Sequence, residues 1–327
     1  MKRTLAAALV LLTLLFLPPW FRAGRTAEAA PPDAPQEEVP FGTADGAMTV
    51  RVWNGGAVET MSAAEYLKNV VRGEMPAAFE EEALKAQAVA ERTYLLYRMS
   101  AAPKASHPQA EVCTDPACCT AWLTAEEAQE KWGEKFRQYE EKVQRAVGDT
   151  DGQVVLYDGV PIMAVFHSSS AGATAASGDV WTAALPYLVS VESPESADSV
   201  PNYYSVSTFG AAEFSRILLA AHPEATLSGS PESWLGDVEL TDSGRVDTAQ
   251  IGGITVTGKE LRSLYGLRST AFTMEADSEG VTFRVTGYGH GVGMSQYGAN
   301  ALAKEGKSWQ EILQWYYTGV TIGLYSG

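Results

Sequence analysis

The sequence predicts an α+β fold, in which a helical core packs with antiparallel β-hairpins and carries an inserted lobe. Helical periodicity and capping signals dominate residues 62–99. Alternating runs around tight turns indicate hairpins at residues 153–166 and 272–286. Residues 187–268 have weaker periodicity between polar turns. We therefore expect the inserted lobe there, within one domain that covers residues 43–327.

Two helices separated by a break account for residues 62–99. Ser62 is followed three residues later by a glutamate, which is the pattern of a capping box at a helix start. Gly73 and Pro76 end this first helix, because proline has no N–H and disfavours a helical conformation in the residue before it. Glutamates at 80–82 suit the first turn of the second helix, since the helix dipole favours negative charge there.

Glu74 lies at the junction of these two helices. The partial negative charge of a helix C-terminus, together with desolvation, would raise the pKa of its carboxyl, as a general acid near neutral pH requires. Lys85 and Arg92 are seven residues apart and share one face of the second helix, which could meet Glu74 or a ligand. The simpler interpretation is a helix hairpin whose charged side chains form solvated ion pairs.

Composition limits the classes of function. The chain has 327 residues, a net charge of −16 and a pI of about 4.7, with 46% hydrophobic residues. This length suits one large domain or two small ones. The acidic balance argues against nucleic acid as a partner, because polyanions bind through positive charge.

The N-terminus has the pattern of a membrane-targeting segment. Two basic residues precede an apolar run at 5–17, which is shorter than the ~20 residues of a typical spanning helix. Residues 1–25 are therefore either a cleaved signal peptide or an uncleaved anchor. In both cases we expect the rest of the chain outside the cytoplasmic membrane. Residues 26–42, rich in Ala, Pro and Glu, indicate a disordered tether.

A glycine-dense loop at 287–298 contains five glycines with polar and aromatic residues between them. Glycine allows a ligand to approach the backbone closely, and the side chains suit the floor of a sugar-binding site. A phosphate cradle is the second interpretation, although the lysine and spacing of a P-loop are absent. A tight loop that crosses beneath another segment is the third. The residues concerned are Tyr288, His290, Ser295, Gln296 and Tyr297.

A second polar loop follows a strand at 166–174. His167 beside Ser168 suggests a serine hydrolase, but adjacent residues on a strand point to opposite faces and cannot pair as base and nucleophile. The chain also has no Gly-x-Ser-x-Gly motif. The simpler interpretation is a histidine whose hydrogen bonds are satisfied at the end of a strand.

One loop gathers His107 and all three cysteines of the chain, Cys113, Cys118 and Cys119. Imidazole and thiolate at this spacing suit tetrahedral zinc. A disulfide competes, because the expected setting is extracytoplasmic. An odd number of cysteines leaves one unpaired, which weakens the disulfide interpretation.

Three motifs in order resemble the stage II sporulation protein D family. They read GEMPAAFEEEALKAQAVAERTY, FHSSSAGATAASGDVW and YGHGVGMSQYGA, and the similarity runs from about residue 49 to the C-terminus. The family comprises membrane-anchored peptidoglycan lytic transglycosylases of endospore-forming bacteria and is related to amidase enhancers. The resemblance implies cleavage between N-acetylmuramic acid and N-acetylglucosamine, which leaves a 1,6-anhydro end.

The resemblance also implies site residues. Glu74 matches the family's essential glutamate, and Lys85 and Arg92 match its basic residues. A zinc ion would be held by His107, Cys113 and Cys119, with Cys118 in place of a usual histidine and a candidate ligand itself. The residues expected to bind the glycan are Tyr94, His167, Ser168, Ser170, His290, Ser295, Gln296 and Tyr297.

The implied chemistry agrees with a single catalytic carboxyl. Most glycosidases use two carboxylates, but a lytic transglycosylase can use one, because its nucleophile is the C6 hydroxyl of the substrate itself. Glu74 would protonate the glycosidic oxygen and then accept the C6 hydroxyl proton.

The expected role is in engulfment during sporulation, on glycan strands whose stem peptides an amidase has removed. The expected partners are therefore this amidase and other engulfment wall hydrolases. The alternative is a non-catalytic protein that binds peptidoglycan and enhances an N-acetylmuramoyl-L-alanine amidase.

Overall fold

The computed structural model describes residues 44–325. The expected N-terminal anchor at 1–25 and the tether at 26–42 lie outside the described residues. Within the described part, no helix has the length and apolar character needed to cross a bilayer. This part mixes helices with several small sheets, as the α+β prediction expects. It contains two hydrophobic cores.

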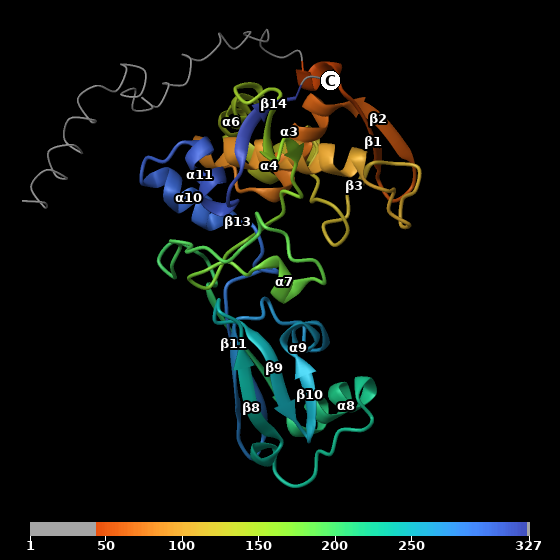
Figure 1. The fold of residues 1–327 in the computed structure, drawn as a ribbon, viewed down its shortest axis with the longest axis vertical. Coiled ribbons are helices and arrows are strands. Elements are labelled where there is room, and N and C mark those ends of the chain that lie inside the picture. The colour runs from red at the N-terminus through yellow and green to blue at the C-terminus, as the bar shows by residue number, and fades with distance from the viewer. Residues whose placement is uncertain (1–43, 326–327) are drawn as a thin grey trace, which may run out of the picture. The chain divides into compact units, whose positions relative to one another are not determined.

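Helix α4 (Glu81–Ser100) is the central element of the first core (Figure 1). The small side chains of Ala83, Ala86 and Ala90 are fully buried, which lets neighbouring helices approach the backbone of α4 closely. Every residue from 86 to 93 is buried, so this stretch has no solvent-facing side. The helices that contact α4 are α3 (Ala63–Glu74), α6 (Phe136–Gly148), α10 (Gln296–Lys304) and α11 (Trp309–Tyr316).

Helix α3 begins as predicted. The Oγ of Ser62 accepts a hydrogen bond from the backbone N–H of Glu65 at 3.2 Å. Gly73, however, does not end the helix, which continues to Glu74. A Cβ at Gly73 would lie 2.7 Å from the backbone nitrogen of Trp122. Glycine is therefore needed here for the close approach of another segment.

Two small sheets accompany the helices of the first core. One has the order β2-β1-β3, with one antiparallel and one parallel pair. The other has the order β14-β4-β5, and its β4–β5 pair confirms a hairpin within residues 153–166. The return strand is shorter than predicted, because it covers only 160–161 and residues 162–165 form no strand. The strands are β1 (Thr49–Trp53), β2 (Val58–Ser62), β3 (Val112–Cys113), β4 (Gln153–Tyr157), β5 (Val160–Pro161) and β14 (Thr321–Leu324).

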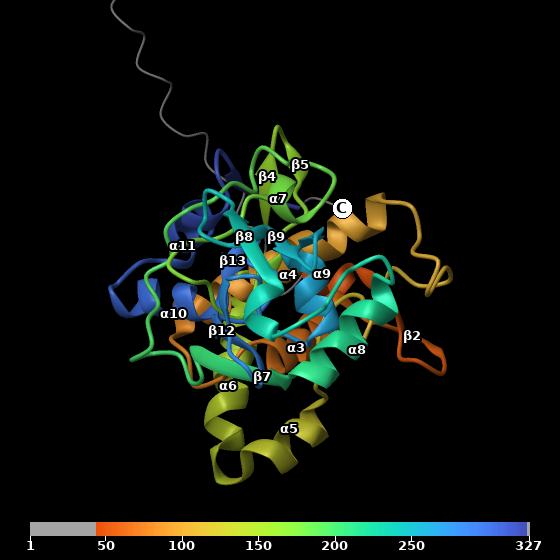
Figure 2. The same ribbon diagram turned by 90° about the horizontal axis from the view of Figure 1, so that it is seen from below.

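Short helices complete this part of the molecule: α2 (Ala44–Ala47), α5 (Ala125–Trp132) and η2 (Gly133–Lys135). Gly133 has a φ of 54°, a conformation that other residues rarely adopt, and it redirects the chain from α5 through η2 into α6. Figure 2 shows α5 and α6 side by side.

The second core is built from two three-stranded antiparallel sheets and two helices (Figure 1). The buried rings of Phe214 and Phe283 lie at its centre, 6.4 Å apart between centroids. The strands are β7 (Tyr204–Gly210), β8 (Leu235–Leu240), β9 (Val246–Ile251), β10 (Ile254–Thr257), β11 (Phe272–Ala276) and β12 (Gly280–Thr286). The helical segments are α8 (Ala211–Ala221), η3 (Pro231–Ser233) and α9 (Gly258–Leu264).

The bounds expected for the inserted lobe, 187–268, need correction at both ends. The hairpin predicted at 272–286 exists as β11–β12, but β12 pairs with β7 and its apolar residues belong to the second core. Tyr187 and Leu188 belong to the first core. The lobe therefore spans roughly β7 to β12, because cross-strand pairing recruits the later hairpin.

The glycine-dense loop carries the chain back from the second core to the first. It ends in β13 (Met294–Ser295), which pairs in parallel with β6 (Phe166–His167). A Cβ at Gly293 would lie 2.0 Å from the carbonyl oxygen of Val165. The loop thus crosses tightly against the second polar loop, as the third interpretation of its glycines expects. The short helix α7 (Ser177–Val180) follows the second polar loop in the chain.

Candidate active site

Glu74 lines a cavity of about 680 Å³, referred to below as the Glu74 cavity. The cavity is bounded by the start of α10, the cysteine loop, the two polar loops and α9 of the lobe. Five of the residues expected to bind glycan line it: Tyr94, His167, Ser168, His290 and Gln296. Cys118 and Cys119 line it as well. The fold therefore brings the three sequence motifs to one cavity.

The carboxyl of Glu74 is held by the cysteine loop. Its Oε1 accepts a hydrogen bond from the backbone N–H of Ala121. On the opposite side, the Nε2 of Gln296 donates to the backbone carbonyl of Glu74 at 3.1 Å. Burial raises the pKa of Glu74 above its usual range, although the Ala121 N–H and Gln296 oppose the shift. The upward shift of this pKa agrees with the sequence prediction, and burial rather than the helix C-terminus is its main cause.

A second carboxyl, Glu91 on α4, interacts with Glu74 and was missed by the sequence analysis. Glu91 is fully buried, and its Oε1 accepts a hydrogen bond from the Nε2 of Gln87 at 2.9 Å. Its Oε2 has no hydrogen-bond partner among the described residues. Burial and the charge of Glu74 raise the pKa of Glu91 well above its usual range. The available signal was the polar i, i+4 pair of Gln87 and Glu91 within an alanine-rich helix.

His290 and Trp181 add aromatic surface to the Glu74 cavity. Their ring centroids are 5.4 Å apart. The backbone N–H of Val292 donates to Nδ1 of His290 at 3.1 Å, so the proton of the neutral ring is on Nε2. Burial and the charges of Arg262 and Arg245 lower the pKa of His290 to about 4, so the ring is neutral at pH 7. Here the cavity therefore offers a ring surface and a neutral N–H donor.

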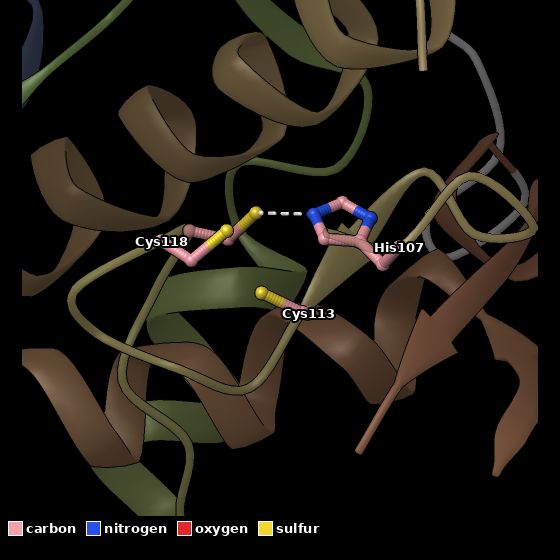
Figure 3. A group of neighbouring side chains, drawn as sticks. His107, Cys113 and Cys118 are labelled. Carbon is pink, nitrogen blue, oxygen red and sulfur yellow. Dashed lines mark hydrogen bonds between the residues drawn. The ribbon is translucent and has the colours of Figure 1, made fainter. Parts of the chain in front are cut away.

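The cysteine loop brings His107 and the three cysteines together. One ligand atom from each residue lies within 4.8 Å of the other three, and Figure 3 shows His107, Cys113 and Cys118 converging. The Nδ1–H of His107 donates to the carbonyl of Ala110 at 3.1 Å, which leaves the lone pair of Nε2 facing Cys119 Sγ at 3.4 Å. None of the three cysteines forms a disulfide.

The thiols of the cluster differ in how easily they ionise to the thiolate that binds a metal. Burial opposes ionisation of Cys118, but hydrogen bonds from Ser106 and Cys113 and the charge of Lys104 lower its pKa to about 7. Burial raises the pKa of Cys113 to about 12. Tetrahedral zinc with this ligand set would hold the donor atoms about 3.5–3.8 Å apart. The cluster fits such an ion after a small contraction, and His107 already has the hydrogen bond that orients metal-bound imidazoles.

Comparisons with known proteins show the family to which the chain belongs. The family model SpoIID, Stage II sporulation protein, matches residues 54–157, which include Glu74 and the cysteine loop. Stage II sporulation protein D of Bacillus subtilis (strain 168) is 39% identical over 267 residues, which cover 81% of this chain and 76% of that protein. The chain belongs to the stage II sporulation protein D family.

Two further relatives are similar over most of this chain. Stage II sporulation protein D of Bacillus amyloliquefaciens is 38% identical over 268 residues, which cover 81% of this chain and 75% of that protein. The amidase enhancer of Bacillus subtilis (strain 168) is 28% identical over 308 residues, which cover 79% of this chain but only 40% of that protein.

In this member of the stage II sporulation protein D family, Lys85 and Arg92 share a helix face as predicted, but that face does not line the Glu74 cavity. The Nζ of Lys85 is 3.2 Å from Asp149 at the end of α6. Arg92 is fully buried, and its guanidinium pairs with Asp45 at 2.7 and 2.5 Å. The expectation that Arg92 contacts Glu74 or a ligand is therefore wrong. The solvated ion pairs of the simpler interpretation are wrong for Arg92 too, because its pair is buried.

Three of the residues expected to bind glycan do not line the Glu74 cavity. Ser170 and Ser295 are fully buried, and Glu195 accepts hydrogen bonds from the backbone N–H of Ser170 and the Oγ of Ser295, both at 2.5 Å. These serines position the loops around the cavity. The ring of Tyr297 packs edge-on against Phe79, with 4.9 Å between centroids.

His167 has both ring nitrogens hydrogen-bonded, as the simpler interpretation of the second polar loop expects. Its Nδ1–H donates to the carbonyl of Val292 at 3.2 Å, and its Nε2 accepts from the Oγ of Ser170 at 2.7 Å. The hydroxyl that pairs with this histidine is thus three residues away, and Ser168 is not its partner. Because Ser170 is fully buried, its hydroxyl cannot reach a substrate in the Glu74 cavity.

Proposed function

We propose that this protein is a peptidoglycan lytic transglycosylase that cleaves the bond between N-acetylmuramic acid and N-acetylglucosamine in strands without stem peptides. One observation carries the proposal. Glu74, whose pKa is raised by burial, is the one carboxyl among the described residues that lines the Glu74 cavity. A single proton-transferring carboxyl is sufficient when the nucleophile belongs to the substrate.

Each proton and bond in the proposed reaction balances. The carboxylic acid of Glu74 protonates the glycosidic oxygen as the bond from this oxygen to C1 of the muramic acid breaks. The resulting carboxylate accepts the proton of the C6 hydroxyl, and O6 bonds to C1. Glu74 is then protonated again, and no water is consumed. The hydrogen bonds to Glu74 from Ala121 and to its backbone from Gln296 keep the carboxyl in place during both steps.

The test compares Glu74→Gln with the unmutated chain on glycan strands that lack stem peptides. We expect the variant to form anhydro products at least about 100-fold more slowly, because the glutamine amide cannot supply the proton. The measurement is mass spectrometry of the products. The control is Glu65→Gln, an exposed glutamate on the same helix, which should retain full activity. Anhydro products at unchanged rates from Glu74→Gln would contradict the proposal.

The similarity to an amidase enhancer supports a second candidate function, in which the protein binds glycan and stimulates an N-acetylmuramoyl-L-alanine amidase. On this reading Glu74 contributes only to binding. The two candidates differ in the same experiment. The enhancer would be favoured by two results together. The unmutated chain would form no anhydro products, and an amidase would release stem peptides faster with this protein than without it.

We propose that His107, Cys113, Cys118 and Cys119 hold a zinc ion. The ion would fix the loop whose Ala121 N–H binds Glu74, a structural role close to the reacting group. Elemental analysis of reduced, purified protein should find about one zinc per chain. His107→Ala should lose most of the zinc. The control His222→Ala, a change in the inserted lobe, should retain the zinc. Zinc-free unmutated protein would contradict this proposal.

We further propose that the protein acts during engulfment in sporulation, anchored by residues 1–25 with the described part outside the cytoplasmic membrane. The names of the two sporulation relatives and the apolar run at 5–17 support this proposal. N-terminal sequencing of the protein from cells should find residue 1 or 2 at the mature terminus. A mature terminus beyond residue 29 would contradict the anchor.

A further inference from the structure

Two arginines of the inserted lobe lie near the Glu74 cavity and form no ion pair with a carboxylate of the described residues. Arg262, on α9, lines this cavity and also an adjoining cavity of about 380 Å³. Arg245, just before β9, lines the adjoining cavity. No carboxylate among residues 44–325 forms an ion pair with either guanidinium. The chain as a whole has a net charge of −16, so these unpaired positive charges are not a consequence of its composition.

Arg245 is a buried charge that the described residues satisfy poorly. The residue is 2% exposed, its Nε and Nη1 have no hydrogen-bond partner there, and its Nη2 is 3.5 Å from the carbonyl of Ala173. Burial and the charge of Arg262 lower the pKa of Arg245 to about 10, although Glu195 and Tyr203 oppose the shift, so Arg245 stays protonated at pH 7. Glu195 forms no ion pair with it and accepts hydrogen bonds from Ser170 and Ser295 instead. A buried, unpaired guanidinium is costly, and an anion would relieve that cost.

The glycine-dense loop leaves room for this guanidinium. A Cβ at Gly291 would lie 2.5 Å from the Cζ of Arg245, so a larger residue would displace it. Gly291 is next to His290, which lines both cavities together with Trp181 and Arg262. The two arginines and the Glu74 cavity are therefore parts of one continuous site.

Arg262 is the arginine that a ligand in the Glu74 cavity can reach. Its Nε donates to the carbonyl of Leu267 at 3.3 Å, which fixes the guanidinium plane. Burial lowers the pKa of Arg262, and Tyr288 opposes this shift. The acidic residues Asp179 and Asp247 line the adjoining cavity but not the Glu74 cavity. A negative ligand is therefore expected on the Glu74 side.

We propose that Arg262, backed by Arg245, binds a carboxylate of the glycan whose linkage Glu74 cleaves. A guanidinium fork matches the two oxygens of a carboxylate. This inference rests on the proposed function. In that substrate the carboxylate is the lactyl group of muramic acid, which is free only after the stem peptide has been removed. A strand with its peptide has an uncharged amide at this position, so the arginines would select peptide-free glycan.

The test measures binding by the full-length chain carrying Glu74→Gln, so that no cleavage occurs. Two glycan strands of equal length differ only in the lactyl group, which is a free carboxylate or its methylamide. We expect the carboxylate strand to bind at least about tenfold more tightly, as hydrogen bonds to a charged group imply. Calorimetric titration gives both dissociation constants.

Additional substitution of Arg262→Gln should remove this preference and change the affinity for the methylamide strand by less than about twofold. The matched control, Arg284→Gln, removes a positive charge from an exposed pair with Glu275 on the same lobe and should keep the preference. Equal affinities for the two strands in the chain with both arginines intact would overturn the carboxylate site. A preference for the carboxylate strand that persists in Arg262→Gln would overturn it too. Absence of binding to either strand would overturn the proposed function as well.

Discussion

At the scale of single residues, Glu74 and Glu91 are two carboxyls that differ in exposure and in role. Glu74 lines the cavity and is hydrogen-bonded to the cysteine loop, whereas Glu91 is fully buried behind it on α4. The charge of Glu74 raises the pKa of Glu91, because two close carboxylates in a weakly solvated region repel each other. Glu91 therefore holds its proton to a higher pH than a free glutamate does, whereas Glu74 exchanges its proton in the proposed reaction.

This assignment predicts how Glu91→Gln changes stability with pH. The pKa of Glu91 is raised in the folded state from 4.5, so the folded protein keeps a proton that the unfolded chain has released. Its contribution to stability is full below pH 4.5 and is lost as pH rises toward the folded pKa. Glu91→Gln should therefore make the stability of the protein fall less between pH 5 and pH 8.

Urea unfolding at several pH values measures this effect. The exposed glutamate Glu141, changed to glutamine, serves as the control and should reproduce the unmutated pH dependence. An identical fall in stability for Glu91→Gln and the unmutated protein would show that Glu91 is not the protonated group.

At the scale of elements, the junction of α3 and α4 depends on how closely the cysteine loop approaches it. A Cβ at Gly73 would lie 2.7 to 2.9 Å from backbone atoms of Ala121 and Trp122. The neighbouring N–H of Ala121 is the donor to Glu74. The packing of this loop against Gly73 therefore sets the position of the reacting carboxyl.

We predict that Gly73→Ala destabilises the protein by about 1–3 kcal/mol, because overpacking against backbone outweighs the better helix propensity of alanine. It should also slow glycan cleavage by about tenfold or more, since the Ala121 N–H is displaced. Urea unfolding and the anhydro-product assay test both effects. Gly46→Ala is the matched control, because a Cβ at Gly46 has no atom within 4 Å. Unchanged activity of Gly73→Ala would show that the packing of the cysteine loop against residue 73 does not affect catalysis.

At the scale of the whole described molecule, the buried pair of Asp45 and Arg92 joins three distant segments. Asp45 lies in α2 and Arg92 in α4, and the Nη1 of Arg92 donates to the carbonyl of Gln153 at 3.1 Å, in β4. The backbone N–H of Asp45 is in turn bound by Asp151 at 2.9 Å. The pair thus ties the start of the described chain to the central helix.

We predict that Asp45→Asn destabilises the protein by about 3–5 kcal/mol, because it leaves the guanidinium of Arg92 buried without a counter-charge. Glu141→Gln, which breaks the exposed pair with Arg137, should cost about 1 kcal/mol or less. Chemical unfolding of both variants measures the difference. Equal effects would mean that the Asp45–Arg92 pair is not a principal support of the fold.

The sequence by itself determined the α+β class, the capped start of α3, the hairpin at β4–β5 and the family of the chain. These features depend on local signals, namely capping residues, periodicity and turn residues, or on motifs that can be read directly. It also predicted that Glu74 lies at the junction of two helices and that His107 and the three cysteines lie together. The cysteine cluster was predictable because residues close together in the chain remain close in space.

Only the tertiary structure decided which side chains face the Glu74 cavity. Arg92 faces Asp45 rather than Glu74, and Ser170 and Ser295 are buried. Arg262 lines the cavity, whereas Glu91 is fully buried and interacts with Glu74 without lining the cavity. Helical spacing gives the face on which a side chain lies but not the element packed against that face. That partner is set by contacts between segments more than 100 residues apart, such as the start of α10 and the junction of α3 and α4, which the hydrogen bond from Gln296 to Glu74 joins. No local pattern encodes such contacts.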